Sequence, residues 1–289
     1  MSDIYGKFNT FCDNLRMSKQ SIESVKYRYD RIQGCLNDTF WNGTGYHTRY
    51  VGSYGRGTAI NLSDIDMIFE IPYCVFCQYD NYYYNGQSAL LQKVKDTLHG
   101  TYPFTRMKGD GQVVVLDFSD GIRFEIVPGC KQSDNSYLYP DTHNGGKWKK
   151  TDPISEINAV WSLNYSTNKN MQHLCRMTRA WKEEHNVPMS GLLIDTLAGR
   201  FLSGWQYAGK SYLYYDYLTR DFFDFLRKED DSKAYWYAIG SNQLVYNQGP
   251  FHCAAERAYN NAMSAIQNEV QNNEWTANYY WQLIYGTRF

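Results

Sequence analysis

The spacing of the apolar residues changes once along the chain, and this change constrains the fold more than any other feature. Between residues 64 and 127 apolar residues alternate with polar ones or form short β-prone runs, whereas from about residue 154 onward they recur at helical spacing. Strands in one half and helices in the other predict an α+β fold with two lobes. We place the boundary near residue 160, with domains at residues 1–160 and 161–289.

Within the first domain, helical spacing predicts one long helix, or two, over residues 2–36. A strand, a helix and the two strands of a hairpin are expected at residues 64–71, 88–98, 112–118 and 122–127. The second domain is expected to be mainly helical, and its clearest helices span residues 171–185, 190–203, 212–227 and 251–272.

Composition excludes several classes of protein. The net charge of the 289 residues is -1, which argues against a dedicated binder of long nucleic acid. No apolar run approaches the roughly 18 residues of a membrane span, so no membrane contact is expected. Seven scattered cysteines suit a reducing compartment. We therefore expect a cytoplasmic protein, and a monomer.

Two aspartates in the first strand are the strongest chemical signal. Asp64 and Asp66 are two residues apart, so in a strand they point to the same face, while Ile65 and Met67 point into the core. Paired carboxylates repel unless a cation offsets them, and hard oxygen ligands favour Mg²⁺ or Mn²⁺. This pattern predicts a metal site, although the same pattern also occurs on solvated strands.

A two-metal site needs a third carboxylate from a neighbouring strand, and Asp117 and Glu125 are the candidates. If Asp120-Gly121 is a two-residue turn, Leu116 pairs with Glu125, and the two acids face opposite sides of the sheet. We favour Glu125 because its strand is closed by a proline, whereas Asp117 adjoins the turn.

The Gly52-Ser53 turn precedes the strand with the two aspartates. Its backbone amides and the Ser53 hydroxyl are suited to holding triphosphate oxygens, helped by the start of a short helix. A plain turn is the alternative, so the turn gains meaning only together with the carboxylates.

In three stretches the chain resembles the polymerase-β-like nucleotidyltransferases, especially the bacterial CD-NTases. These stretches are Val51-Gly52-Ser53, then Asp64-Ile65-Asp66-Met67 after ten intervening residues, and Phe124-Glu125-Ile126-Val127-Pro128. The CD-NTases are relatives of cGAS, the animal oligoadenylate synthases and the dinucleotide cyclase of Vibrio. The resemblance implies a core whose mixed sheet is flanked by helices, a helical substrate-binding lobe, and an active site in the cleft between them.

The resemblance continues over residues 174–182 and 187–193. It implies that Arg179 and Ser190 contact the donor triphosphate, with Lys182 as a helical neighbour of Arg179; a solvated helix face is the alternative for these cations. Two departures are evident: the third carboxylate is Glu125 where many relatives have aspartate, and Gly191 replaces an aromatic residue used in some relatives for base stacking.

By resemblance, the chain uses two Mg²⁺ ions, or Mn²⁺, to condense ATP, GTP or pyrimidine nucleoside triphosphates into a cyclic oligonucleotide, foremost a cyclic dinucleotide. The family implies antiphage signalling through a product-responsive effector encoded nearby. The alternatives are transfer to another acceptor, such as an RNA end, a protein or a small molecule, and an inactive nucleotide-binding module.

One polar segment has two possible interpretations. Residues 141–153 contain Lys147, Lys149 and Lys150. The segment is expected to form either a lid that brings a lysine near phosphate or a solvated loop.

Overall fold

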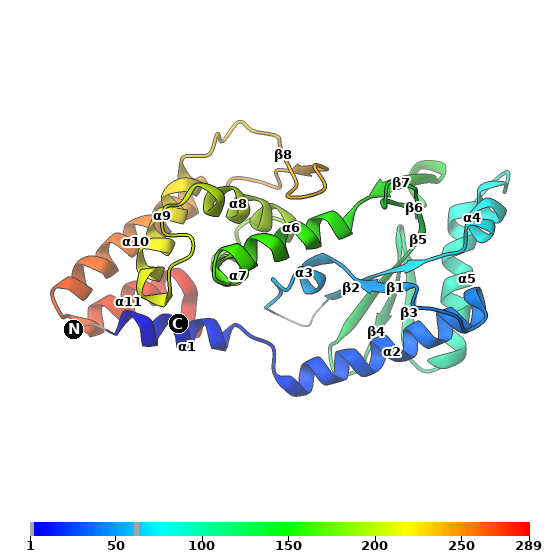
Figure 1. The fold of residues 1–289 in the computed structure, drawn as a ribbon, viewed down its shortest axis with the longest axis horizontal. Coiled ribbons are helices and arrows are strands. Elements are labelled where there is room, and N and C mark those ends of the chain that lie inside the picture. The colour runs from blue at the N-terminus through cyan, green and yellow to red at the C-terminus, as the bar shows by residue number, and fades with distance from the viewer. Residues whose placement is uncertain (1–2, 61–63) are drawn as a thin grey trace. The chain divides into compact units, whose positions relative to one another are not determined.

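The computed structural model describes residues 3–60 and 64–289, and its contacts divide the chain into two compact units, shown in Figure 1. The sheet unit consists of the described residues of 17–56 and 61–157. The helical unit consists of those of 1–16, 57–60 and 158–289. The chain passes from one unit to the other close to the expected residue 160, but the first helix packs with the helical unit, not with the sheet.

The sheet unit is built on a mixed sheet, which in the described part of the chain has seven strands. Five lie in the order β1-β2-β5-β4-β3; β2 and β5 are parallel and the other pairs are antiparallel. The far end of β5 pairs with β6, which pairs with β7. The strands are β1 (Thr48–Tyr50), β2 (Asp64–Glu70), β3 (Arg106–Asp110), β4 (Val113–Asp117), β5 (Arg123–Lys131), β6 (Tyr137–Asp141) and β7 (Lys147–Thr151).

Helices cover one face of this sheet. Apolar side chains of α2 (Lys19–Trp41), α4 (Tyr73–Asp80) and α5 (Gly86–Thr101) form one cluster with Ile65 and Met67, which are both fully buried. Because side chains alternate along a strand, residues 64, 66 and 125 lie on the opposite face. The expected α+β fold with a helix-flanked mixed sheet is confirmed.

The expected N-terminal helix is two helices, α1 (Ile4–Asn14) and α2, and residue 2 lies outside the described part. The Ser18 side chain accepts a hydrogen bond from the Ser21 backbone and so starts α2 anew. Phe8 of α1 packs edge to face against Trp281 and Phe289, which explains why α1 belongs to the helical unit.

Four helices were expected after residue 170, and the structure contains all four. The bounds of three agree closely with the expected ones. The helix expected at residues 212–227 begins with a 3₁₀ turn, η2 (Tyr212–Tyr214). Helix α11 and the β8–β9 hairpin were not expected. The elements are α6 (Pro153–Ser166, which starts in the sheet unit), α7 (Asn170–Glu184), α8 (Gly191–Gly204), α9 (Tyr215–Arg227), β8 (Tyr235–Tyr237), β9 (Leu244–Tyr246), α10 (His252–Val270), α11 (Glu274–Tyr285) and η3 (Gly286–Arg288). Among the described residues, no helix is both long and apolar enough to cross a membrane.

Residues 141–151 form most of a β-hairpin, with a short 3₁₀ turn, η1 (His143–Gly145), between β6 and β7. Lys149 Nζ lies 2.7 Å from Asp141, and Lys150 Nζ lies 2.5 Å from Asp134. Two of the three lysines are therefore paired with carboxylates of the sheet unit itself, which gives them a structural role in the hairpin.

Candidate active site

Strand β2 presents its two aspartates as the alternation predicts. Ile65 and Met67 are fully buried, whereas the Asp64 side chain is 52% exposed and Asp66 is half-buried. The two carboxylates therefore point to the face opposite the apolar cluster, where Asp64 is open to solvent and Asp66 is only partly so.

The parallel pairing of β2 with β5 brings the expected third carboxylate beside them. In the register of the two strands, Asp66 lies opposite Glu125, and Asp64 lies opposite Arg123. Residues opposite one another share a face of the sheet, so Asp64, Asp66 and Glu125 lie on one face, which we call the carboxylate face.

The expected register of the β4–β5 hairpin is wrong by one residue. Val115 pairs with Glu125, and Asp117 pairs with Arg123. The reason is a three-residue turn: Phe118 N–H bonds to Ile122, and Gly121 closes the turn with a φ of 85°. Asp117 therefore lies on the same face as Glu125, not on the opposite one.

Arg123 is a charged residue of the carboxylate face that the sequence did not lead us to expect there. Its Nε donates to Asp117 Oδ1 at 2.7 Å, and its Nη1 lies 3.7 Å from Asp64 Oδ1 and 4.0 Å from Glu125 Oε1. The hydrogen bond to Asp117 raises the pKa of Arg123. A basic residue two positions before Glu125 on the same strand was the available signal, because it must share that face.

The carboxylate face carries more negative charge than the protein itself offsets. Burial raises the pKa of Asp66, the charge of Arg56 lowers it, and Asp64 raises it further. Burial likewise raises the pKa of Glu125, and the charges of Asp66 and Asp64 add to this effect. The ionised forms are thus disfavoured in this arrangement, and a bound cation would favour them.

The Gly52 turn fits closely against the Asp66 side chain and has a backbone conformation that favours glycine. Gly52 has a φ of 58°, and a Cβ at this position would lie 1.8 Å from Asp66 Oδ2. The Val51 N–H also bonds to Asp66 O at 2.9 Å. Ser53 follows in the single-turn helix α3 (Gly52–Gly55). The contacts of Val51 and Gly52 with Asp66 therefore fix the position of this helix relative to the carboxylate.

At the end of this turn, Arg56 is buried and forms an ion pair with Glu156, with 3.3 Å between Nη1 and Oε2. A buried pair of this kind fixes the turn, because removing either partner leaves an uncompensated charge.

The residues expected to bind nucleotide in the helical unit have a different environment. Arg179 is 7% exposed and donates to both carboxylate oxygens of Asp195, at 2.6 and 3.0 Å, and to Gly191 O at 2.9 Å. Although burial disfavours its charge, Asp195 raises the pKa of Arg179. The Arg179 guanidinium thus forms an internal ion pair that ties α7 to α8, and the phosphate contact expected of it stays a prediction.

Ser190 and Lys182 lie nearby in sequence. The Ser190 side chain accepts a hydrogen bond from Leu193 N at 3.1 Å and caps α8. Lys182 is partly exposed near the end of α7 and forms no ion pair with any residue that the structure describes. Their nucleotide-binding roles stay predictions. A local contact explains why residue 191 is glycine, because a Cβ there would lie 3.1 Å from Arg179 Nη2.

The carboxylate face fits a hard divalent cation by the chemistry of its donors. Among the described residues, no three acidic, histidine or cysteine side chains are already gathered as a metal site. Instead, the Arg123 guanidinium stands among three carboxylates, in the place where positive charge is favoured. The charge of this face therefore favours a cation. In this structure the Arg123 guanidinium supplies that positive charge.

Comparisons with known proteins cover the part of the chain that contains the carboxylate face. The family model for the Second Messenger Oligonucleotide or Dinucleotide Synthetase domain matches residues 3–164, which include β2, β5 and the Gly52 turn. At the level of sequence, no curated protein matches significantly.

Solved structures share the fold at low sequence identity. The CdnC structure with ATP from E. coli MS115-1 has a TM-score of 0.67 at 17% identity, over 97% of this chain and 98% of that one. The CD-NTase CdnG with GTP from Bradyrhizobium diazoefficiens has a TM-score of 0.65 at 10% identity, over 99% and 96%. The DncV cyclic AMP-GMP synthase of Vibrio cholerae has a TM-score of 0.61 at 14% identity, over 83% and 68%. The expected resemblance to the CD-NTases is confirmed.

Proposed function

Because the chain belongs to the Second Messenger Oligonucleotide or Dinucleotide Synthetase family, we propose that it joins nucleoside triphosphates into a cyclic dinucleotide. The observation that carries the proposal is the register that sets Glu125 opposite Asp66, with the Gly52 turn against the same aspartate. The structures of CdnC with ATP and CdnG with GTP support ATP and GTP as substrates.

The reaction is an in-line displacement. A 2′- or 3′-hydroxyl of one nucleotide attacks the α-phosphorus of another; the new phosphodiester bond forms as the bond to the β-phosphate breaks, and pyrophosphate leaves. Repeating the step within the linear product closes the ring. Two Mg²⁺ ions held by Asp64, Asp66 and Glu125 would supply the charge that stabilises the attacking and leaving oxygens.

The chain's own residues have three tasks. Gly52 lets the backbone approach Asp66, and Ser53 in the next position orients the β- and γ-phosphates. Glu125, which lies opposite Asp66 on the same face, accepts the proton of the attacking hydroxyl. Arg123 holds Asp117 and so keeps that carboxylate from competing as a ligand.

Family membership extends the proposal to antiphage signalling, in which the product activates an effector encoded nearby. This part is tested in cells: expression of the chain with its neighbouring genes lowers phage plaque formation, and Asp64→Asn with Asp66→Asn removes the protection. Equal plaque numbers with and without the wild-type locus, across a phage panel, would contradict the signalling role.

The biochemical test is product identification. Purified protein is incubated with radiolabelled ATP, GTP, CTP and UTP and Mg²⁺, treated with phosphatase, and analysed by mass spectrometry. A phosphatase-resistant cyclic product and released pyrophosphate are expected. Linear tails, or labelled RNA or protein, would instead assign the transfer to another acceptor.

A further inference from the structure

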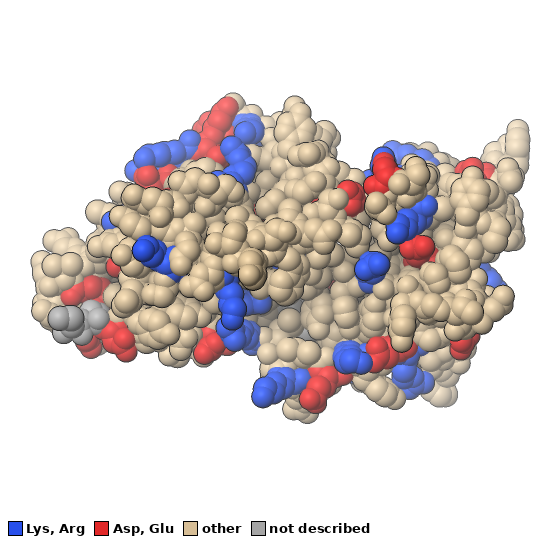
Figure 2. Space-filling model, viewed as in Figure 1, with Lys and Arg blue, Asp and Glu red and all other residues tan. Residues whose placement is uncertain are grey.

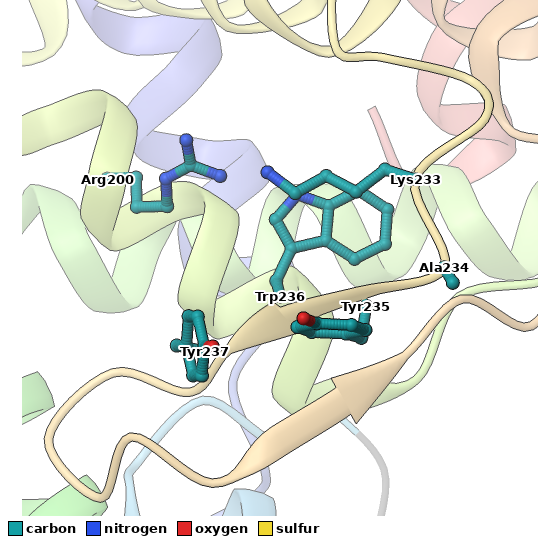
Figure 3. Close-up of a pocket in the computed structure, with 6 residues that line it drawn as sticks. All are labelled: Arg200, Lys233, Ala234, Tyr235, Trp236 and Tyr237. Carbon is teal, nitrogen blue, oxygen red and sulfur yellow. The ribbon is translucent and has the colours of Figure 1, made fainter.

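The helical unit contains a cavity of about 550 Å³ beside strand β8, shown in Figure 3. Its volume lies in the range of small-molecule sites. None of its residues belongs to the carboxylate face or to the expected nucleotide contacts. One residue comes from α8 and five are consecutive at the start of the hairpin: Arg200, Lys233, Ala234, Tyr235, Trp236 and Tyr237.

Two cations line this cavity, and a mostly buried carboxylate is paired with one of them. Arg200 Nη1 lies 3.4 Å from Glu229 Oε2, and Glu229, only 9% exposed, also accepts the Trp236 indole N–H at 2.7 Å. Figure 3 shows the charged ends of Arg200 and Lys233 directed toward one another.

The Lys233 ammonium lies 5.5 Å from the centre of the Trp236 ring and forms no ion pair with the residues that the structure describes. Asp230, nearby in the same loop, accepts hydrogen bonds from both the backbone and the hydroxyl of Ser232. Arg200 and Lys233 both border the cavity, so a phosphate that lies in it could accept hydrogen bonds from both side chains.

The cavity follows an open strand edge. Asn247 N donates to Ala234 O, so residues 234 and 236 direct their backbone groups toward β9. By the alternation of an antiparallel ladder, the backbone N–H and C=O of Tyr235 and Tyr237 point away from β9. No further strand pairs with β8 in the described part of the chain, so this edge offers free donors and acceptors.

Aromatic rings complete the lining. Tyr235 and Tyr237 are 39% and 61% exposed, and their rings meet edge to face at 5.7 Å. Between them in sequence, Trp236 is 2% exposed and anchors the strand on its other face. Exposed tyrosine rings held by an anchored strand suit the stacking of planar bases.

We propose that this cavity binds a nucleotide as a second site, independent of the carboxylate face. Its phosphate lies between Arg200 and Lys233, its base stacks on Tyr235 or Tyr237, and the polar edge of the base meets the strand backbone. A long nucleic acid is disfavoured, because acidic and basic side chains are interspersed on the face drawn in Figure 2. An extended acidic peptide is disfavoured, because a three-residue strand offers few backbone bonds.

Calorimetry on the whole chain carrying Asp64→Asn and Asp66→Asn, in EDTA, tests the second site without binding at the metal site. ATP, GTP, CTP, UTP, inorganic triphosphate and a hexaglutamate peptide are the probes. Arg200→Gln with Lys233→Gln is expected to weaken the nucleotide that binds best by about 10-fold or more. Tyr235→Ser with Tyr237→Ser is expected to weaken that nucleotide and leave inorganic triphosphate unchanged.

The matched control, Arg257→Gln with Lys210→Gln, removes the same charge from exposed positions of the same unit and is expected to change nothing. Thermal unfolding checks that all variants fold. The proposal is overturned if no nucleotide binds, if the Arg200 and Lys233 changes act no more than the control, if inorganic triphosphate binds as tightly as nucleotides, or if hexaglutamate binds in their place. Every variant carries Asp64→Asn and Asp66→Asn and is tested for binding alone. The result therefore does not depend on whether the chain synthesises a cyclic dinucleotide.

Discussion

Each of the two units contains an arginine that is paired with carboxylate, but the two groups differ in charge balance and exposure. Arg179 and Asp195 form a one-to-one pair with side chains 8% and 0% exposed. Arg123 faces Asp64, Asp117 and Glu125, and these side chains are 29% to 52% exposed. A balanced buried pair holds a fold together, whereas an unbalanced open group is prepared for a ligand. The following changes test this distinction.

The largest effect is expected from Asp64→Asn with Asp66→Asn. Loss of both carboxylates removes the cation site, so product formation should fall by about 1,000-fold or more. The unfolding temperature should stay equal or rise, because repulsion on the face is relieved. Mass spectrometry and thermal unfolding measure the two effects. The control Asp110→Asn, on exposed strand β3, should keep activity; full activity in the double variant would refute the site.

Breaking the buried pair should act on stability instead. Asp195→Asn leaves the Arg179 charge uncompensated and should lower the free energy of unfolding by about 3 kcal/mol. The exposed pair of Arg288 and Glu183 is the control, and Glu183→Gln should cost less than about 1 kcal/mol. Urea unfolding measures both. Unchanged stability together with lost triphosphate binding would instead support the expected role of Arg179 as a phosphate contact.

Gly52→Ala should disturb the carboxylate face through the backbone. The new Cβ would collide with Asp66, and alanine is strained at this positive φ, so activity should fall by about 10- to 100-fold and stability by about 1 to 2 kcal/mol. Gly34→Ala, in α2 with no atom within 4 Å of its Cβ, should stabilise by about 0.5 to 1 kcal/mol. An active Gly52→Ala protein would show that the close approach to Asp66 is dispensable.

Arg123→Met should give the smallest effect, seen in cation binding. Removing a charge that competes for the same carboxylates should tighten Mn²⁺ binding about 3- to 10-fold in calorimetry. Lys108→Met, which removes a lysine paired with Asp110 on β3, should leave Mn²⁺ affinity unchanged. Weaker Mn²⁺ binding would mean that Arg123 positions the carboxylates instead of competing with the cation.

Where alternation alone decides, the sequence predicted correctly which side chains share a face of the sheet. Asp64 and Asp66 share a face because a buried residue lies on either side of Asp66. The hairpin register could not be derived, because Asp120-Gly121 suits both a two-residue and a three-residue turn. The resulting shift of the register by one residue reversed the face assigned to Asp117, so its contact with Arg123 was not expected.

Strands with polar sequences were missed for a related reason. β3 has one apolar residue, Met107, and its pairing with β4 is decided by the neighbouring strand, not by its own pattern. The partner of Arg179 was also hidden, since Asp195 is 16 residues away, on the next helix. Helical spacing gives a helix its faces, but tertiary packing determines which cation is buried.

The most direct measurement compares pyrophosphate release by Glu125→Gln and Asp117→Asn with Mg²⁺ and all four nucleoside triphosphates. Both residues lie on one face of the sheet, but Asp117 is occupied by Arg123 at 2.7 Å, whereas Glu125 lies opposite Asp66. Our account predicts that Glu125→Gln abolishes release and that Asp117→Asn retains most of it. Release that persists in Glu125→Gln and disappears in Asp117→Asn would contradict the account.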